Sequence, residues 1–180
     1  MTSSAAATLA PVAFIDLAAQ RARIGHRIDA AVSKVLQSCR FINGPEVTEL
    51  EEKLAAFAGA KYAVSCSSGT DALALILMAW GVKPGDAVFC PSFTFCATAE
   101  VVPYLGATPV FVDVLPGTFN MDPDSLDAAV AVAIEQGLDP RVVIPVDLFG
   151  QPADYDAILP LAEKYGMKVL CDTAQGFGEI

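Results

Sequence analysis

Apolar residues near the start of the chain recur at helical spacing. Between Ile24 and Leu36 every third or fourth position is apolar, and this spacing predicts an amphipathic surface helix. Asn43-Gly44-Pro45 would end that helix, because glycine and proline interrupt regular structure. A second apolar pattern begins at Pro45 and reaches Phe57, so we expect a second helix there, ended by Gly59.

The pattern changes at Tyr62, after which short apolar runs alternate with helical patterns about five times. The runs that we expect to be strands cover residues 62–66, 87–90, 109–114, 141–146 and 168–171. The patterns that we expect to be helices cover residues 71–80, 98–105, 122–137 and 154–165. Asp122 is the expected N-cap of the helix over residues 122–137, with Pro123 at its first position. The alternation predicts the α/β class, with a mostly parallel sheet covered by helices on both faces.

These patterns divide the chain into three parts. Residues 1–13 are expected to be a flexible tail, residues 14–61 a helical segment, and residues 62–180 an α/β domain. The start of the chain is rich in Ala and Ser but has neither a basic beginning nor a long apolar stretch. We therefore expect no signal peptide and no transmembrane helix, and a cytoplasmic protein that does not bind membranes.

Composition and charge narrow the possible functions. The chain has 180 residues and is 54% hydrophobic, so it is not a disordered or solvating segment. A net charge of −10 without any cluster of Lys and Arg argues against nucleic acid as a partner. The five cysteines form no Cys-x-x-Cys pair, and His26 is the single histidine, so no metal site is expected. Unpaired cysteines suit a reducing compartment.

Candidate chemistry follows from where the predicted strands end, because ligands of open parallel sheets bind outside the carboxyl ends of the strands. Polar and aromatic residues follow those ends at 67–71, 91–95, 147–151 and 172–175. Ser68-Gly69-Thr70 opens a helix, whose free N–H groups and dipole suit a phosphate. An ordinary N-cap with a tight turn explains that stretch about as well. It is neither a Walker A loop nor Gly-x-Gly-x-x-Gly.

Asp172 follows the apolar run Val169 to Cys171. A carboxylate in such a place is costly unless it has a cationic or hydrogen-bond-donating partner, although it could also cap the next turn. Phe93 and Phe95 would by ordinary burial statistics belong to the core by roughly three to one over a stacking role. His26 lies in a predicted surface helix, where we expect it to be solvated.

Several motifs resemble those of the DegT/DnrJ/EryC1/StrS aminotransferases. They are Ser-Gly-Thr-Asp-Ala-Leu at 68–73, Pro-Gly-Asp at 84–86, Pro-Ser-Phe-Thr-Phe at 91–95, Gly-Ala-Thr-Pro-Val-Phe-Val-Asp-Val at 106–114, Asp-Leu-Phe-Gly-Gln at 147–151 and Asp-Thr-Ala-Gln at 172–175. The resemblance implies a large domain of PLP-dependent fold type I, like that of aspartate aminotransferase. It also implies transfer of an amino group, usually from glutamate, to a keto-sugar carried on a nucleotide, by a homodimer. Such reactions serve cell-surface polysaccharide or secondary-metabolite sugar biosynthesis.

The same resemblance assigns a role to each candidate residue of the site. The cofactor-binding residues would be Gly69, Thr70, Asp71, Phe95, Asp172 and Gln175. The first three would hold the phosphate of pyridoxal 5'-phosphate, the Asp71 backbone included. Phe95 would stack on one face of the ring, with Ala174 against the other. Asp172 would pair with the ring nitrogen and Gln175 with the phenolic oxygen. The stretch 147–151 would lie near the substrate.

One feature departs from the family pattern. The family's Schiff-base lysine lies beyond Asp-x-x-Gln, so the resemblance places it after residue 180, and no lysine of this chain is assigned to that role. We therefore expect a truncated large domain, without a catalytic residue of its own and inactive alone. Two alternatives stay open: the sugar-dehydratase branch of the family, in which histidine replaces the lysine, and a non-catalytic relative that binds a nucleotide sugar or the cofactor. Motifs near Phe14, Gln20 and Gly44-Pro45 look most like the branch that acts on a 3-keto UDP-N-acetylglucosaminuronate.

Overall fold

A computed structural model describes residues 14–178, so the tail predicted at residues 1–13 lies outside the described residues. Contacts within the chain separate two units, Met1–Leu54 and Ala55–Ile180. The boundary falls inside a helix, a few residues before Tyr62, where the sequence pattern changes.

The first unit consists of α1 (Leu17–Ser38) and most of α2 (Pro45–Phe57). The helix predicted from Ile24 to Leu36 is confirmed, and it extends further at both ends. Asp16 caps its start by accepting a hydrogen bond from the Ala19 N–H at 2.9 Å. Cys39 ends it in a left-handed conformation, with φ of 54°. Two caps that periodicity alone does not reveal thus lengthen this helix.

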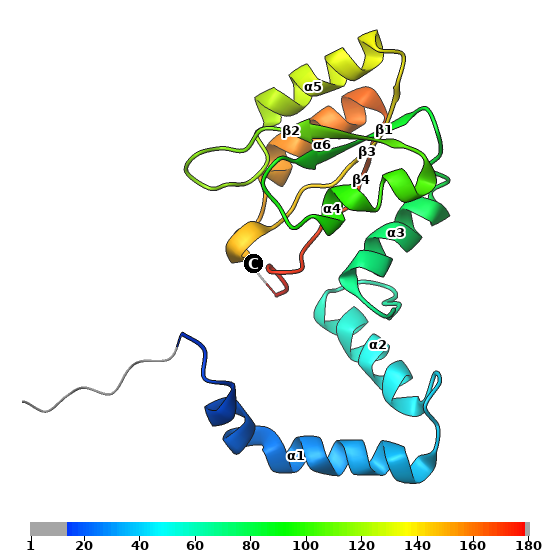
Figure 1. Ribbon diagram of the computed structural model, residues 1–180, viewed down its shortest axis with the longest axis vertical. Helices are drawn as coiled ribbons and strands as arrows, with labels where there is room; N and C mark the ends of the chain where they lie inside the picture. Colours follow the sequence, from blue (N-terminus) through cyan, green and yellow to red (C-terminus); the bar gives the residue numbers. More distant parts are fainter. Residues whose placement is uncertain (1–13, 179–180) are drawn as a thin grey trace, which may run out of the picture. The chain divides into compact units, whose positions relative to one another are not determined.

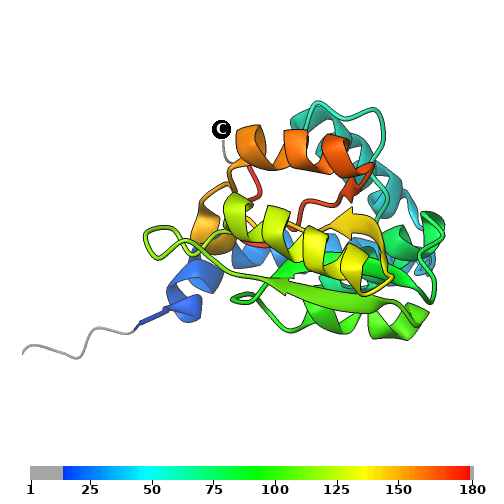
Figure 2. The same ribbon diagram turned by 90° about the horizontal axis from the view of Figure 1, so that it is seen from above.

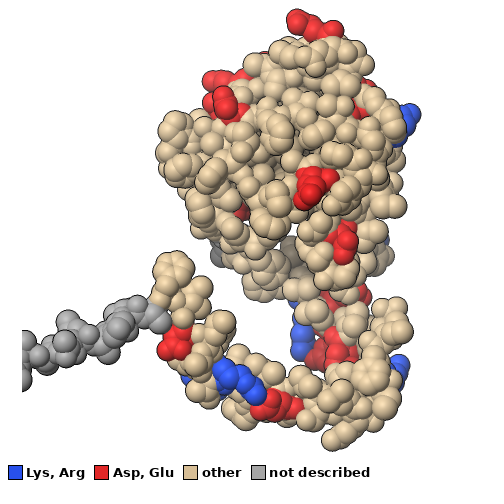
Figure 3. All heavy atoms as spheres, in the orientation of Figure 1, with Lys and Arg blue, Asp and Glu red and all other residues tan. Residues whose placement is uncertain are grey.

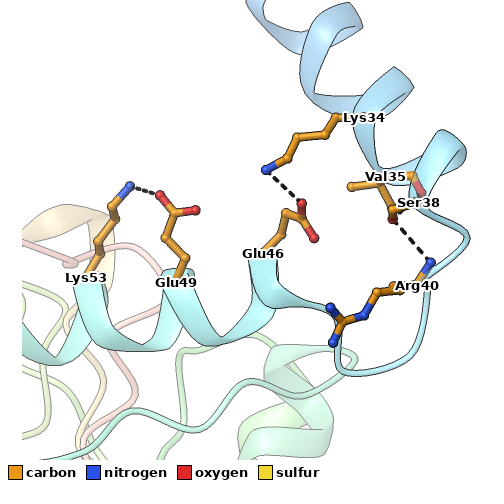
Figure 4. Close-up of polar contacts among 7 residues, drawn as sticks. All are labelled: Lys34, Val35, Ser38, Arg40, Glu46, Glu49 and Lys53. Carbon is orange, nitrogen blue, oxygen red and sulfur yellow. Dashed lines mark hydrogen bonds and ion pairs between the residues drawn. The ribbon is translucent and has the colours of Figure 1, made fainter.

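Ion pairs lie on the surface of these two helices, as Figure 4 shows. Lys34 of α1 lies 3.2 Å from Glu46 in the first turn of α2, and Lys53 pairs with Glu49 one turn away. Backbone hydrogen bonding at the helix start, followed by the hydrogen bond from Lys34, lowers the pKa of Glu46. These pairs are exposed, so each contributes little to stability.

The second unit is an α/β layer structure built on a four-stranded sheet. Its strands are β1 (Asp86–Pro91), β2 (Thr108–Val112), β3 (Asp139–Val143) and β4 (Lys168–Val169), in the order β2-β1-β3-β4 and all parallel. Its helices are α3 (Gly69–Ala79), α4 (Ala97–Glu100), α5 (Pro123–Glu135) and α6 (Tyr155–Tyr165), with short 3-10 turns η1 (Pro103–Leu105) and η2 (Leu148–Gly150). The predicted α/β class with a parallel sheet is confirmed.

Alternate residues of β1 point to opposite faces of the sheet, and helices cover both. Ala87 and Phe89 pack into a core with α5 and α6. Val88 packs into a second core with α3 and the residues that follow α4. Figure 1 shows the sheet between these two helix layers, and Figure 2 shows α5 and α6 side by side on one of them. Every residue of β1 is buried, as a central parallel strand requires.

The strand order places a topological switch between β1 and β3. The chain leaves β1 toward β2 on one side and later returns to β3 on the other side. The helix after β1, α4, contacts α3 and leads into residues of the core on that face, whereas the helix after β3, α6, packs into the core on the opposite face. Loops that diverge in this way leave a crevice at the carboxyl ends of the strands, where ligands of such sheets bind.

Two of the predicted elements differ from the structure. Residues 62–66 are not a strand of the described sheet, and Tyr62 and Val64 are 74% and 88% exposed. A strand exists only if a neighbour pairs with it, and the apolar pattern cannot reveal the neighbour. The helix predicted over 98–105 is divided into α4 and η1. Pro103 has no N–H to donate, which favours a break between the two.

Candidate functional site

A cavity of about 220 Å³ at the carboxyl edge of the sheet joins the start of α3 to the loop after β4. Its lining comes from two segments that are far apart in the sequence: Gly69, Ala72, Leu73, Ile76, Leu170, Cys171, Asp172, Thr173 and Ala174. The structure therefore brings the predicted phosphate-binding turn and the predicted strand-end acid to one cavity. Of the six predicted cofactor-binding residues, Gly69 and Asp172 line this cavity, whereas Thr70, Asp71, Phe95 and Gln175 do not.

Ser68 caps the start of α3. Its Oγ accepts a hydrogen bond from the Asp71 N–H at 3.1 Å and lies 3.0 Å from Asp71 Oδ2. The Ser67 hydroxyl also donates to Asp71 Oδ2. The hydrogen bond from the Ser67 hydroxyl, followed by that from the Ser68 hydroxyl, lowers the pKa of Asp71. Because the Asp71 N–H is already used, the N–H groups of Gly69 and Thr70 are the ones at this helix start without an acceptor inside the helix.

Gly69 is not required by the protein's own packing. Its φ is not positive, and a Cβ built there would meet no other described atom within 4 Å. The residue nevertheless lines the cavity, so a side chain here would project into open space at the helix start. Close approach of a ligand to the backbone is the remaining physical reason for a glycine at this place. That observation matches an anion held by the first N–H groups of α3.

Asp172 follows an apolar run, so its carboxylate needs hydrogen-bond donors, and the structure supplies them. Thr98 Oγ1, fully buried on α4, donates to Asp172 Oδ2 at 3.0 Å. Since that proton goes to Asp172, the Thr94 hydroxyl donates to Thr98 Oγ1 across 3.0 Å. The Ala174 N–H donates to Oδ1 at 3.3 Å. The carboxylate is thus fixed from both sides beside the cavity.

Sequence reasoning missed Thr98. Its signal is the spacing of Thr94 and Thr98, because two hydroxyls four residues apart share one face of a helical turn. Nothing in the sequence, however, indicates that this turn lies beside Asp172, which is far away along the chain.

Gln175 is fixed by a backbone group of η2. The Phe149 N–H donates to Gln175 Oε1 at 2.6 Å. Because a backbone N–H can only donate, the carbonyl oxygen of the amide must face it, and the amide nitrogen is left to donate elsewhere. Phe149 has a φ of 58°, which is unusual for an aromatic residue. A phenolic oxygen would be a suitable acceptor for the remaining N–H groups.

The aromatic residues after β1 are exposed. Phe93 is 49% and Phe95 is 71% exposed, so the core position that burial statistics favour for both is wrong. The reason is local: both follow the end of β1 on the loop at the edge of the sheet rather than lying in the strand itself. An exposed ring at this edge is available for stacking.

Asp147, which lies in the stretch expected near a substrate, organises the loop that contains it. It is buried and accepts hydrogen bonds from the Ala153 N–H at 3.0 Å and from the Tyr155 hydroxyl at 2.8 Å. Burial, followed by hydrogen bonds to Cys171 and Asp147, raises the pKa of Tyr155. A larger cavity of about 670 Å³ borders this pair, and Thr173 lines both cavities. The loop of Asp172 and Thr173 therefore separates them.

Among residues 14–178, His, Cys, Asp and Glu form no group of three placed to hold a metal ion. No helix in that range is long and apolar enough to cross a membrane. On the face drawn in Figure 3, Lys and Arg side chains are scattered rather than gathered into a patch.

Comparison with known proteins identifies relatives over almost the whole chain. The profile of the DegT/DnrJ/EryC1/StrS aminotransferase family matches residues 22–180. The chain is 53% identical over 167 residues to the UDP-2-acetamido-2-deoxy-3-oxo-D-glucuronate aminotransferase of Pseudomonas aeruginosa, covering 93% of this chain and 45% of that protein. The chain thus spans less than half the length of this relative.

Solved structures give the same picture. A DegT DnrJ EryC1 StrS aminotransferase from Brucella abortus superposes with a TM-score of 0.90 at 51% identity, over 93% of this chain and 45% of that one. NtdA from Bacillus subtilis, solved with bound cofactor PMP, has a TM-score of 0.74 at 35% identity, over 84% and 33% of the two chains. The α/β unit with its parallel sheet is thus that of solved aminotransferases.

Proposed function

Because the chain belongs to the DegT/DnrJ/EryC1/StrS aminotransferase family, we propose that the whole protein is a pyridoxal-phosphate-dependent aminotransferase acting on a nucleotide-linked keto-sugar. Its amino donor is glutamate, and its product enters cell-surface polysaccharide or secondary-metabolite sugar biosynthesis. The observation that carries the proposal is the cavity that sets the start of α3, at Gly69, beside the carboxylate of Asp172. An anion site and an acid at one cavity suit a phosphorylated cationic ring.

The start of α3 would hold the cofactor phosphate. The N–H groups of Gly69 and Thr70 point out of the helix without an acceptor inside it, and the helix dipole favours an anion there. The open space at the Gly69 Cβ position lets an anion approach the backbone. Asp71 supports this turn through Ser67 and Ser68 rather than through its own N–H, which already donates to Ser68.

Asp172 would pair with the nitrogen of the cofactor ring. When bound, the protonated ring supplies an electron sink for the proton removals that move the amino group. Thr98 and the Ala174 N–H hold the two carboxylate oxygens, so Asp172 is oriented before the ring arrives. Phe95, exposed at the same edge, would cover one face of the ring and Ala174 the other.

Gln175 would donate to the phenolic oxygen of the ring. Its carbonyl oxygen is held by the Phe149 N–H, which leaves the amide N–H groups as the donors. The described lysines do not line the cavity, so these residues bind and orient the cofactor while the reactive amine comes from elsewhere in the whole protein. The proposal also places the protein in the cytoplasm, where the five free cysteines suit a reducing compartment, and takes from the family that it is a homodimer.

The test compares three forms of the whole protein: wild type, Asp172→Ala and Asp113→Ala. Asp113 is an exposed acid that follows β2 at the same edge of the sheet, so it controls for the loss of a strand-end charge. Cofactor binding is followed by its visible absorbance, and turnover by the consumption of glutamate with a UDP-linked 3-keto-sugar. We expect Asp172→Ala to lose at least about 100-fold in kcat/KM, as removal of a preorganised partner does, and Asp113→Ala to stay close to wild type.

Two results would contradict the proposal. A wild-type protein that binds no pyridoxal phosphate would refute the cofactor, and near-normal turnover by a folded Asp172→Ala variant would refute the role of the carboxylate. Circular dichroism of each variant separates loss of function from loss of fold.

A further inference from the structure

Three phenylalanine rings meet at the carboxyl edge of the sheet, each from the loop that follows a different strand. Phe93 follows β1, Phe119 follows β2 and Phe149 follows β3. Their ring centroids are 5.5 Å apart for Phe93 and Phe119, 6.3 Å for Phe93 and Phe149, and 6.1 Å for Phe119 and Phe149. We call these three rings the aromatic cluster. The members are 49%, 44% and 69% exposed, so the cluster forms part of the surface rather than of the core.

Two members of the aromatic cluster adopt a backbone conformation that bulky residues avoid. Phe119 has a φ of 62° and Phe149 a φ of 58°, both in the left-handed region. Such strain persists only where the surrounding structure enforces it, and it is concentrated at functional sites. Burial of the rings does not explain it, because both rings remain partly in solvent.

Asn120 ties the two loops that contain these strained residues to each other. It is buried, and its Nδ2 donates to the carbonyl oxygens of Gln151 at 3.0 Å and Pro152 at 2.8 Å. Its Oδ1 accepts from the Leu148 N–H at 3.4 Å. The loop of Phe119 and the loop of Phe149 are therefore tied together immediately beside the two strained residues. A buried polar tie that holds exposed rings in place indicates a preformed surface.

The aromatic cluster is connected to the candidate cofactor site at two points. The Phe149 N–H donates to Gln175 Oε1. Phe93 precedes Thr94, whose hydroxyl contacts Thr98, the donor to Asp172. A ligand on the cluster would thus lie beside a molecule bound at Asp172 and Gln175.

The size of the exposed aromatic surface decides between two kinds of occupant. A phenylalanine buries about 150–250 Å² when covered, so three rings of this exposure offer roughly 300 Å². A stable protein interface needs about 800 Å² from each partner, which is far more than the cluster offers. The area that the cluster offers is enough to cover one flat, uncharged ring system of a small molecule. Phe149, the most exposed ring, meets Phe119 edge to face at 84°, so Phe119 supports it and leaves a face free.

We propose that the aromatic cluster binds the base of the nucleotide-linked substrate by stacking, chiefly on Phe149. The inference rests on the proposed function for the identity of the substrate. Every nucleobase has an aromatic face that stacks on phenylalanine, and aromatic rings recognise bases in this way without hydrogen bonds. Phe93 and Phe119 act by positioning the Phe149 ring.

The test measures binding of UDP to the whole protein by calorimetry, without cofactor and without amino donor. Wild type is compared with Phe149→Leu, Phe149→Trp and the control Phe111→Leu. Phe111 is equally a surface ring, 59% exposed on β2, but it is outside the cluster. We expect Phe149→Leu to weaken UDP binding by roughly 5- to 150-fold, the range that base stacking covers. Phe149→Trp should keep or strengthen binding, and Phe111→Leu should not change it.

Two further measurements make the outcomes decisive. Inorganic pyrophosphate, which has no base, should bind more weakly than UDP, and it should bind equally well to wild type and to Phe149→Leu. If wild type binds UDP and pyrophosphate with equal affinity, the base contributes nothing and the proposal is wrong. If Phe149→Leu binds UDP as tightly as wild type, the proposal is wrong. The same holds if Phe149→Leu changes the oligomeric state of the protein and leaves the UDP affinity unchanged. The proposed function can fail separately, because cofactor binding and turnover are measured without reference to Phe149.

Discussion

Asn120→Ala offers the sharpest test of how the loops at the edge of the sheet are held. The side chain is 3% exposed and makes three hydrogen bonds to the backbone of residues 148–152. Alanine removes both the donor and the acceptor, and it leaves three backbone groups without the partner they have in the native protein.

The expected cost follows from the state of those three groups. A buried group that loses its partner costs roughly 1–3 kcal/mol. Gln151 and Pro152 are exposed residues, so water can partly replace Nδ2 at their carbonyl oxygens, and the 3.4 Å bond from Leu148 is long. We therefore take the lower end for each and expect a loss of about 3 kcal/mol in the free energy of unfolding. For a unit of this size, that corresponds to roughly 10 °C in Tm.

Urea unfolding followed by circular dichroism measures this loss. Gln151→Ala is the matched control, because Asn120 contacts the backbone carbonyl of Gln151 and not its side chain. The control should stay within about 0.5 kcal/mol of wild type, as exposed substitutions do. If Asn120→Ala also stays within that range, the loops are held by something else and the role given to Asn120 is wrong.

Three other outcomes follow from the same structure. Phe89→Ala, at a fully buried position of β1, should lower the free energy of unfolding by about 3–5 kcal/mol in urea titrations; a loss below about 1 kcal/mol would contradict its place in the core. Lys164 first and then Tyr165 lower the pKa of Asp127 below its ordinary 3.8, so the stability advantage of wild type over Asp127→Asn should be present at neutral pH and disappear as the pH falls through that lowered value. Burial raises the pKa of Cys90 to about 12, so a thiol reagent should modify the other four cysteines in the native protein and Cys90 only after unfolding.

The fold could be predicted where the signal is local. Asp122 and Pro123 begin α5 as expected, and the Asp122 side chain accepts from the Asp124 N–H at 2.9 Å. The fully apolar run of β1 indicates a strand buried on both faces. The run 62–66 has the same local character, but no described strand pairs with it. Pairing depends on residues distant in sequence, so composition within a run cannot decide it.

The candidate site shows the same division. The sequence indicates Gly69 and Asp172 because a helix start and a strand end are local features, and parallel topology brings such ends to one edge. It does not indicate Thr98, which reaches Asp172 across 74 residues, or Asn120, which reaches Gln151 across 31. Those contacts depend on how two loops meet, and polar residues in loops carry no periodic pattern that would reveal it.

The hydrogen bonds at this edge form a connected series that joins the aromatic cluster to the candidate cofactor site. Asn120 holds the turn that contains Phe149, and the N–H of Phe149 in turn fixes the amide of Gln175. A left-handed Phe149 therefore has two consequences: its ring is presented to solvent, and its N–H is aimed at Gln175. In an extended conformation the N–H and the ring could not keep both directions, because a change of φ rotates one relative to the other. The left-handed conformation of Phe149 is thus the physical reason that one position can present an exposed ring and also donate to the amide of Gln175.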